Sequence, residues 1–220
     1  MRRLIVNADD LGYDPAIDRG ILEAHARGLV SSATAMVDTP FAAAALAAAP
    51  RSLGLGLHAV LDPGLDRARA EAELVRQLAR FEALRGAPPT HLDSHKHAHA
   101  RPAILEAFGA VAAARRLPVR SVTPAMRATL RGWGIATPER FLGDADRRPA
   151  WDEASLAAAL AGLEEGVAEL MAHPGHAPTH ARTSFGVERE VELAALTSPL
   201  CRAALERVGG VLCSYADIGG

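Results

Sequence analysis

The sequence has two cysteines, little net charge and no long apolar run, and each of these absences excludes a class of protein. Cys201 and Cys213 form neither a secreted disulfide framework nor a cysteine metal site. A formal net charge of -2 gives no electrostatic footprint for nucleic acid or an anionic membrane. The opening MRRLIVNADD has too short an apolar run for a signal peptide, and no stretch approaches the length of a membrane span. We therefore expect a cytoplasmic protein.

Short β-type runs alternate with helical patterns along the 220 residues, which favours a single α/β domain over 1–220. The segment 123–151 is broken by prolines and glycines, and we expect a loop with some helix there. About seven parallel strands fit a barrel related to the (β/α)8 type or an open doubly wound sheet. We predict strands at 4–7, 32–37, 53–58, 90–95, 118–122, 167–172 and 211–215, and helices at 14–28, 41–49, 66–85, 102–116, 155–165, 188–196 and 199–207.

Reactive side chains stand at the ends of four of these predicted strands. Ligands and catalytic groups gather at the C-terminal ends of strands in α/β folds, and in barrels essentially always there. We therefore expect the side chains to converge on one rim. The five residues are Asp9, Asp10, His58, His95 and His173.

One carboxylate and two neutral imidazoles make a divalent-metal site with open positions, and Asp10, His58 and His95 can supply them. Asp9 is then the candidate base for a metal-bound water. Neighbouring residues on an extended strand point in opposite directions, so both aspartates can serve only if the chain turns, which Gly12 makes plausible. The alternatives are a capping turn at the two aspartates and a structural role for His58.

The run from His91 to His99 places histidines at alternate positions, so its odd members are predicted to share one face of a strand. Within it, Asp93 is better placed to orient a ligating imidazole than to bind metal itself. His97 is a candidate substrate neighbour in a loop, and a surface metal-scavenging tract is the alternative for the whole run.

Two further residues belong to the predicted site. His173, at the end of its strand, is a candidate acid that protonates a leaving amine. Arg120, at the end of the predicted strand 118–122, either orients a carboxylate, contacts substrate or lies on the surface beside a helix. Tyr215 is expected to pack rather than react.

Six segments, in order and from the first residues to the last, resemble the successive motifs of the YdjC/ChbG carbohydrate deacetylases. This family includes chitooligosaccharide deacetylases and hopanoid-biosynthesis-associated proteins. The combination of NADD-x-G with HLDSH is specific. The segments are LIVNADDLG (4–12), GLVSSATAMV (28–37), LGLGLH (53–58), THLDSHKHAH (90–99), ELMAHPG (169–175) and CSYADI (213–218).

The resemblance implies a TIM-barrel-like (β/α) fold and one divalent metal ion, Mg²⁺ or Zn²⁺, held by Asp10, His58 and His95. It places Asp9 at the general-base position and His173 near the active centre. The implied reaction is hydrolysis of the acetamido group of a small-molecule acylated amino sugar of the N-acetylglucosamine type. Relatives often form homodimers, which makes a homodimer the expectation by analogy.

The sequence departs from the family's pattern at two places. Lys96 stands where many relatives have histidine. The segment 59–64 after His58 leads almost directly into a helix, where the family has a longer loop that helps to form the substrate cleft. A more open cleft, taking a larger or differently shaped acylated amino sugar, is our hypothesis.

Two rival functions share these residues. A non-haem iron oxygenase also uses two histidines and a carboxylate, although a second adjacent aspartate favours hydrolysis. A catalytically silent sugar-binding protein is expected to have lost a ligand or the base, and this sequence retains both.

Overall fold

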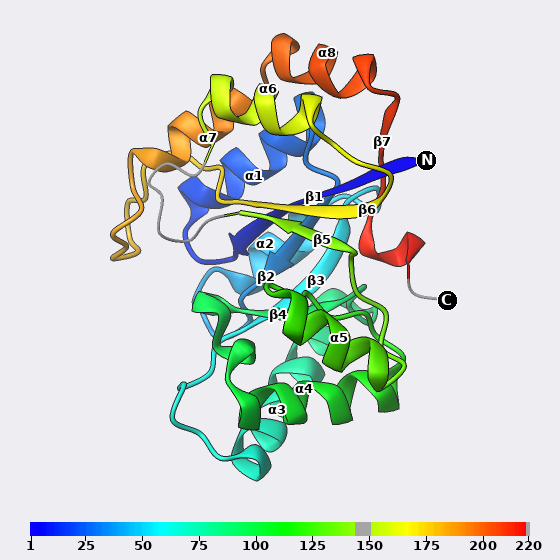
Figure 1. The fold of residues 1–220 in the computed structure, drawn as a ribbon. Coiled ribbons are helices and arrows are strands. Elements are labelled where there is room, and N and C mark those ends of the chain that lie inside the picture. The colour runs from blue at the N-terminus through cyan, green and yellow to red at the C-terminus, as the bar shows by residue number, and fades with distance from the viewer. Residues whose placement is uncertain (144–150, 219–220) are drawn as a thin grey trace.

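The computed structural model describes residues 1–143 and 151–218, and these form a parallel sheet with helices around it (Figure 1). The order of the main sheet is β4-β3-β2-β1-β6-β5, and every ladder is parallel. Its strands are β1 (Arg2–Leu11), β2 (Ser32–Ala35), β3 (Gly54–Ala59), β4 (Leu92–Ser94), β5 (Arg140–Leu142), β6 (Gly166–Ala172) and β7 (Gly210–Leu212).

The central strand β1 has three neighbours. On one side of β1, residues 2–8 pair with β6. On the other side, residues 2–4 of β1 pair with β7, and β1 pairs with β2 from Asn7 onwards. Residues 4–11 of β1 are buried, as expected for a parallel strand that is covered on both faces.

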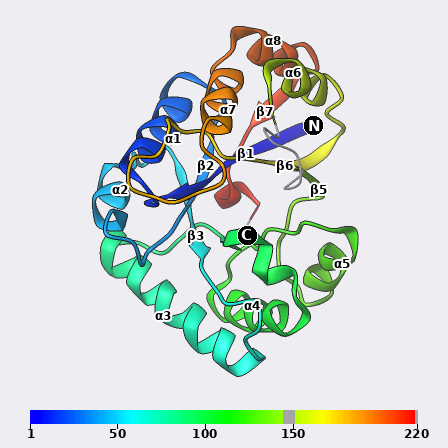
Figure 2. The ribbon, with the colours of Figure 1, turned by 90° about the vertical axis from the view of Figure 1, so that its left-hand side faces the viewer.

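The helices surround the strands in the view of Figure 2. Two of them begin with a capping side chain followed by proline: the Asp14 carboxylate before Pro15 accepts from the Ala16 N–H, and the Ser198 hydroxyl before Pro199 accepts from the Leu200 N–H. The helices are α1 (Pro15–Arg27), α2 (Ala42–Ala48), α3 (Arg67–Arg85), α4 (Pro102–Arg115), α5 (Pro124–Gly132), α6 (Glu153–Ala161), α7 (Glu188–Leu196) and α8 (Pro199–Arg207), with short 3₁₀ turns η1 (His95–Ala100) and η2 (Tyr215–Asp217).

The sheet curves into a half-barrel, which confirms the predicted parallel α/β architecture of about seven strands. Within the described ranges no ladder joins the edge strands β4 and β5. Beyond β4, the side of the half-barrel between these two strands is formed by residues around Val119. Leu92 makes a single parallel bridge to Val119, and the Val119 N–H donates to the Ala136 carbonyl.

Two predictions about the segment 118–151 were wrong. The strand expected at 118–122 is reduced to the bridge at Val119, because on its other side the Val119 N–H bonds the carbonyl of Ala136, which belongs to no strand. The fifth strand is β5 instead, inside the segment 123–151 that we expected to be loop with some helix; that segment does contain α5. Residues 144–150 of the segment lie outside the described residues.

No helix in the described part of the chain combines the length and the apolar character needed to cross a bilayer.

Candidate metal centre and active site

The end of β1 brings two adjacent aspartates to one place. Asp10 has a left-handed backbone (φ 74°), Gly12 has φ 84°, and the register with β2 shifts between Ala8 and Leu11. The turn predicted from Gly12 therefore begins at Asp10 itself, a residue type that tolerates this conformation. The Gly12 N–H donates to the Asp18 carboxylate at 2.6 Å, which holds the turn. Both aspartate side chains are buried and face the same site.

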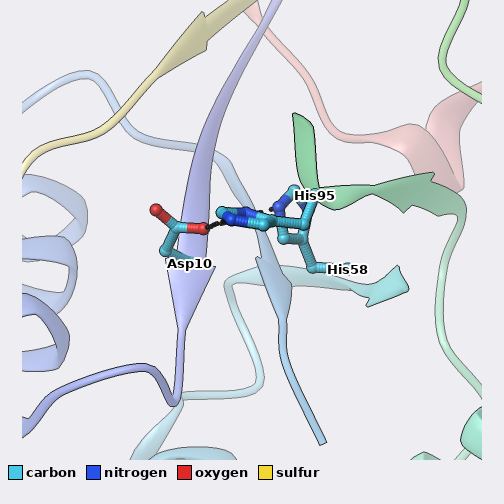
Figure 3. Close-up of side chains that lie close together, drawn as sticks. All are labelled: Asp10, His58 and His95. Carbon is cyan, nitrogen blue, oxygen red and sulfur yellow. Dashed lines mark ion pairs between the residues drawn. The ribbon is translucent and has the colours of Figure 1, made fainter. Parts of the chain in front are cut away.

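Asp10 on β1, His58 on β3 and His95 at the start of η1, directly after β4, converge on one point (Figure 3). Oδ1 of Asp10 lies 3.4 Å from Nε2 of His58 and 3.3 Å from Nδ1 of His95, and one ligand atom from each residue lies within 4.8 Å of the other two. Asp10 and His58 are buried, whereas the His95 side chain is 28% exposed. The cluster is therefore open to solvent on the His95 side.

These three residues fit a divalent cation. Among the described residues, no donor is aligned to hydrogen-bond Oδ1 of Asp10, although this oxygen is buried, and an unsatisfied buried carboxylate oxygen is costly. The other oxygen, Oδ2, accepts from Nη2 of Arg189 at 2.6 Å. Burial opposes ionisation of Asp10, but the contact with His95 and the charge of Arg189 hold its pKa well below the ordinary value. An ionised oxygen beside two imidazoles is a suitable ligand set.

His58 is oriented by Asp93, whose Oδ1 lies 2.7 Å from Nδ1 of the ring. A carboxylate can only accept, so Nδ1 carries the hydrogen and Nε2 is directed at Asp10. Thr34 in turn donates to the second oxygen of Asp93 at 3.1 Å. Burial lowers the pKa of His58, but the charges of Asp93 and Asp9 outweigh burial and raise the pKa to about 9.

Asp9 is held by Arg120 through both carboxylate oxygens. Nη1 and Nη2 of Arg120 donate to Oδ2 and Oδ1 of Asp9, each at 2.7 Å, and Asn7 donates to Oδ1 at 2.9 Å. Arg120 is fully buried, which excludes the surface role considered from the sequence. Burial again opposes ionisation, but Arg120 keeps the pKa of Asp9 below its usual range. Asp9 is therefore an ionised carboxylate in a fixed orientation.

A second group of donor atoms, from Asp9, His58 and Asp93, also lies within 4.8 Å of one another. The two carboxylates in this group both contact Arg120. This second group already holds a cation of its own, so the first group is the better candidate for metal.

His173 follows β6 and stands beside Asp9, with 4.0 Å between its Nε2 and Oδ2 of Asp9. Its backbone N–H donates to Glu192 at 2.6 Å, and its ring packs at 5.2 Å from that of Phe185. The side chain is 23% exposed, so the imidazole is fixed by its neighbours yet reachable from solvent.

The histidine run does not follow one strand face, so that prediction was wrong. β4 ends at Ser94, and Lys96 and His97 both adopt a left-handed backbone (φ 52°) inside η1. The ring of His97 packs against Phe141 at 5.8 Å, and His99 is buried with its Nδ1 against the Ser94 hydroxyl. Neither His97 nor His99 joins the clusters of metal-type donors found in the described residues.

Sequence reasoning did not find three buried residues that support the site: Thr34, Glu169 and Arg189. Glu169 carried a usable signal, because it is a lone carboxylate within the apolar run of β6. Arg189 lies in the ordinary helical pattern of α7 and carried none.

Comparisons with known proteins find relatives that match over nearly the whole chain. A chitooligosaccharide deacetylase from Serratia marcescens is 36% identical, and a carbohydrate deacetylase from Geobacillus stearothermophilus is 33% identical, each alignment covering 98% of both chains. The crystal structure of an Enterococcus faecalis protein, for which cleavage of cellobiose phosphate has been suggested, superposes with a TM-score of 0.87 at 26% identity, covering 100% of this chain and 99% of that one. The family of YdjC-like proteins matches residues 3–207. The chain belongs to this YdjC-like family.

Proposed function

We propose that this protein is a metal-dependent carbohydrate N-deacetylase that hydrolyses the acyl amide of an amino sugar. The observation that supports it best is the convergence of Asp10, His58 and His95 around one unsatisfied carboxylate oxygen, with Asp9 and His173 beside it. The names of the two deacetylase relatives, which match over nearly the whole chain, point to the same reaction.

The proposed ligands are Asp10, His58 and His95. Two imidazoles with a single carboxylate favour Zn²⁺ or a similar first-row metal over Mg²⁺, which prefers oxygen ligands. A divalent ion held there would acidify a water molecule, so that even a weakly basic carboxylate can take its proton, and would polarise the acyl carbonyl.

Asp9 is the proposed base. Its contacts with Arg120 keep the carboxylate ionised and fix its direction, so it can accept the proton that the attacking water loses. His173 is the proposed acid: its Nε2 lies 4.0 Å from Oδ2 of Asp9 and its side chain is reachable from solvent, so it can protonate the leaving nitrogen. Asp93 keeps His58 in the tautomer that a ligand needs.

The substrate is proposed to be an acylated amino sugar, larger or differently shaped than a short chitooligosaccharide, bound in a wide cleft. Only residues 60–66 connect β3 to α3, so little chain is available to cover the metal ligands on that side. We therefore expect larger N-acetylated glycoconjugates to be better substrates than short chitooligosaccharides. Equal rates on glycoconjugates and on short chitooligosaccharides would contradict the wide cleft but would leave the proposed hydrolysis of the acyl amide unaffected.

The test is a screen of N-acetylated sugars and glycolipid head groups for release of a free amine. The protein is stripped with a chelator and reloaded with Zn²⁺, Co²⁺ or Mg²⁺ before assay. We expect amine release that is lost after stripping and restored by reloading, and that is absent from Asp10→Ala in every metal. Amine release at full rate from stripped protein would refute metal dependence. Oxygen uptake with Fe²⁺ and a sugar, without amine release, would support the oxygenase alternative instead.

A further inference from the structure

A buried chain of contacts runs from the candidate base to the C-terminal segment of the protein. Arg120 holds Asp9 with its two Nη groups and donates from Nε to Oε1 of Glu169 at 2.8 Å. The hydroxyl of Tyr215 donates to the other oxygen of Glu169. Arg120, Glu169 and Tyr215 are all fully buried, although they come from three separate parts of the sequence.

The tyrosine at the end of this chain is itself fixed. Its ring stacks on that of His91, with centroids 3.7 Å apart and planes 6° from parallel. His91 fits only because residue 56 is glycine: a Cβ there would lie 2.4 Å from Cε1 of the imidazole. These residues come from the LGLGLH, THLDSH, ELMAHPG and CSYADI segments, which the metal ligands and the proposed acid and base do not fully explain.

We infer that Glu169 and Tyr215 are positioning residues, which fix the Arg120 guanidinium so that its fork holds Asp9 in the direction needed for proton transfer. The inference rests on the proposed function. A guanidinium is planar and presents its five N–H groups in a rigid arrangement. The Nε contact with Glu169 therefore sets the plane and the position of both Nη groups. Tyr215 fixes the orientation of the Glu169 carboxylate by donating a hydrogen bond to its second oxygen.

Without this support, the Arg120 guanidinium has another carboxylate within reach, that of Asp93. Its Nη1 already lies 2.7 Å from Asp93 as well as from Asp9. A guanidinium released at Nε can rotate toward Asp93 and leave one oxygen of Asp9 free. A small displacement of a reacting group costs a large factor in rate, whereas Asp10, His58 and His95 make no contact with Glu169 or Tyr215 among the interactions of the described residues.

The test compares Tyr215→Phe with wild type, both loaded with Zn²⁺, on a sugar that wild type deacetylates. We expect kcat to fall about ten-fold or more, in the range seen for outer-shell partners of metal sites, with KM and the Zn²⁺ dissociation constant within about two-fold. Glu169→Gln keeps an oxygen that can accept from Nε, so its kcat is expected to stay within about three-fold of wild type.

A double-mutant cycle separates positioning from a general structural effect. If Tyr215 acts through Arg120, then Tyr215→Phe changes kcat by less than about two-fold in an Arg120→Lys background, because the fork it supports is gone. Phe81→Leu, a change at a fully buried residue of α3, is the matched control that lowers stability without changing kcat below the unfolding temperature.

Three results overturn the inference: wild-type kcat in Tyr215→Phe, a full additional loss in the Arg120→Lys background, or a Glu169→Gln variant that loses ten-fold or more. If the wild-type protein releases no amine from any sugar, the proposed function falls together with the inference. If wild type is active and Tyr215→Phe equals it, only the inference falls.

Discussion

Replacing Asp9 with asparagine changes one atom of the proposed base while keeping its size. Asp9 accepts two hydrogen bonds from Arg120 and one from Asn7. In Asp9→Asn the amide oxygen can keep one hydrogen bond with Arg120. The amide NH₂ faces the other guanidinium N–H, and because both groups are donors the second hydrogen bond is lost. The metal ligands Asp10, His58 and His95 are unchanged.

Two effects of different size follow. Loss of one charge-assisted hydrogen bond lowers the free energy of unfolding by about 2–3 kcal/mol, because Arg120 keeps its contacts with Asp93 and Glu169. Loss of a general base lowers kcat by about 10²–10⁴-fold, which corresponds to about 3–5 kcal/mol in the activation barrier. The variant is thus expected to remain folded and to bind Zn²⁺ with near wild-type affinity while losing turnover.

The matched control is Asp93→Asn, which also removes one negative charge from Arg120. Because Asp93 orients His58, this change is expected to weaken Zn²⁺ binding by about 10–100-fold and to affect kcat at saturating metal less than Asp9→Asn does. Amine release gives kcat, calorimetric titration with Zn²⁺ gives affinity, and urea unfolding gives stability. Turnover of Asp9→Asn within ten-fold of wild type, at saturating metal, would refute the assignment of the base.

Three further outcomes are expected. Burial, with the nearby charge of Asp14, raises the pKa of Asp18 to about 7, so ionisation of Asp18 lowers the free energy of unfolding as pH rises from about 4 to 7. The free energy of unfolding of Asp18→Asn, measured in urea, should therefore exceed that of wild type by about 2–4 kcal/mol at pH 8 but not at pH 4. Equal stability at pH 8 would contradict this. His173→Gln should lower amide hydrolysis by about 10²-fold or more yet spare an aryl acetate, whose leaving group needs no proton; equal losses would exclude the acid role. Gly56→Ala should lower the free energy of unfolding by about 1–3 kcal/mol, because its Cβ meets His91; an unchanged urea midpoint would show that the ring can move.

The sequence was sufficient to predict most of the fold, because hydrophobic runs and helix caps are local signals. Asp14-Pro15 and Gly86 mark helix ends where α1 begins and α3 stops. The exceptions come from elements of very few residues. β5 has three residues of intermediate burial between Pro138 and Gly143, and a strand so short leaves no period-2 pattern to read.

The candidate site could be predicted only in its outline. Asp10, His58 and His95 were found because each stands where a strand ends, a position that topology makes convergent. Their second partners depend on distant parts of the chain: Arg189 is 179 residues from Asp10, and Arg120 is 111 residues from Asp9. No local pattern encodes such pairs. The left-handed backbone of Asp10 was similarly missed, since the sequence pointed to Gly12 as the turn.

The balance of buried charge gives a reason, independent of the family, for a cation at the centre of the site. The pKa of each of the three carboxyl groups, Asp9, Asp10 and Asp93, is lowered, so all three are ionised. Two guanidiniums, those of Arg120 and Arg189, lie against them, and Arg120 also lies against Glu169, so the carboxyl groups outnumber the guanidiniums.

A proton on His58 offsets part of this negative charge, and the charges of Asp93, Asp9 and Asp10 therefore raise the pKa of His58. That proton and a metal ion compete for the same atom, since Nδ1 faces Asp93 and only Nε2 faces Asp10. A divalent ion held there in place of the proton would add one more positive charge beside the buried Oδ1 of Asp10. In the proposed hydrolysis, this positive charge would stabilise the oxyanion that forms on the acyl oxygen when water attacks the acyl carbon.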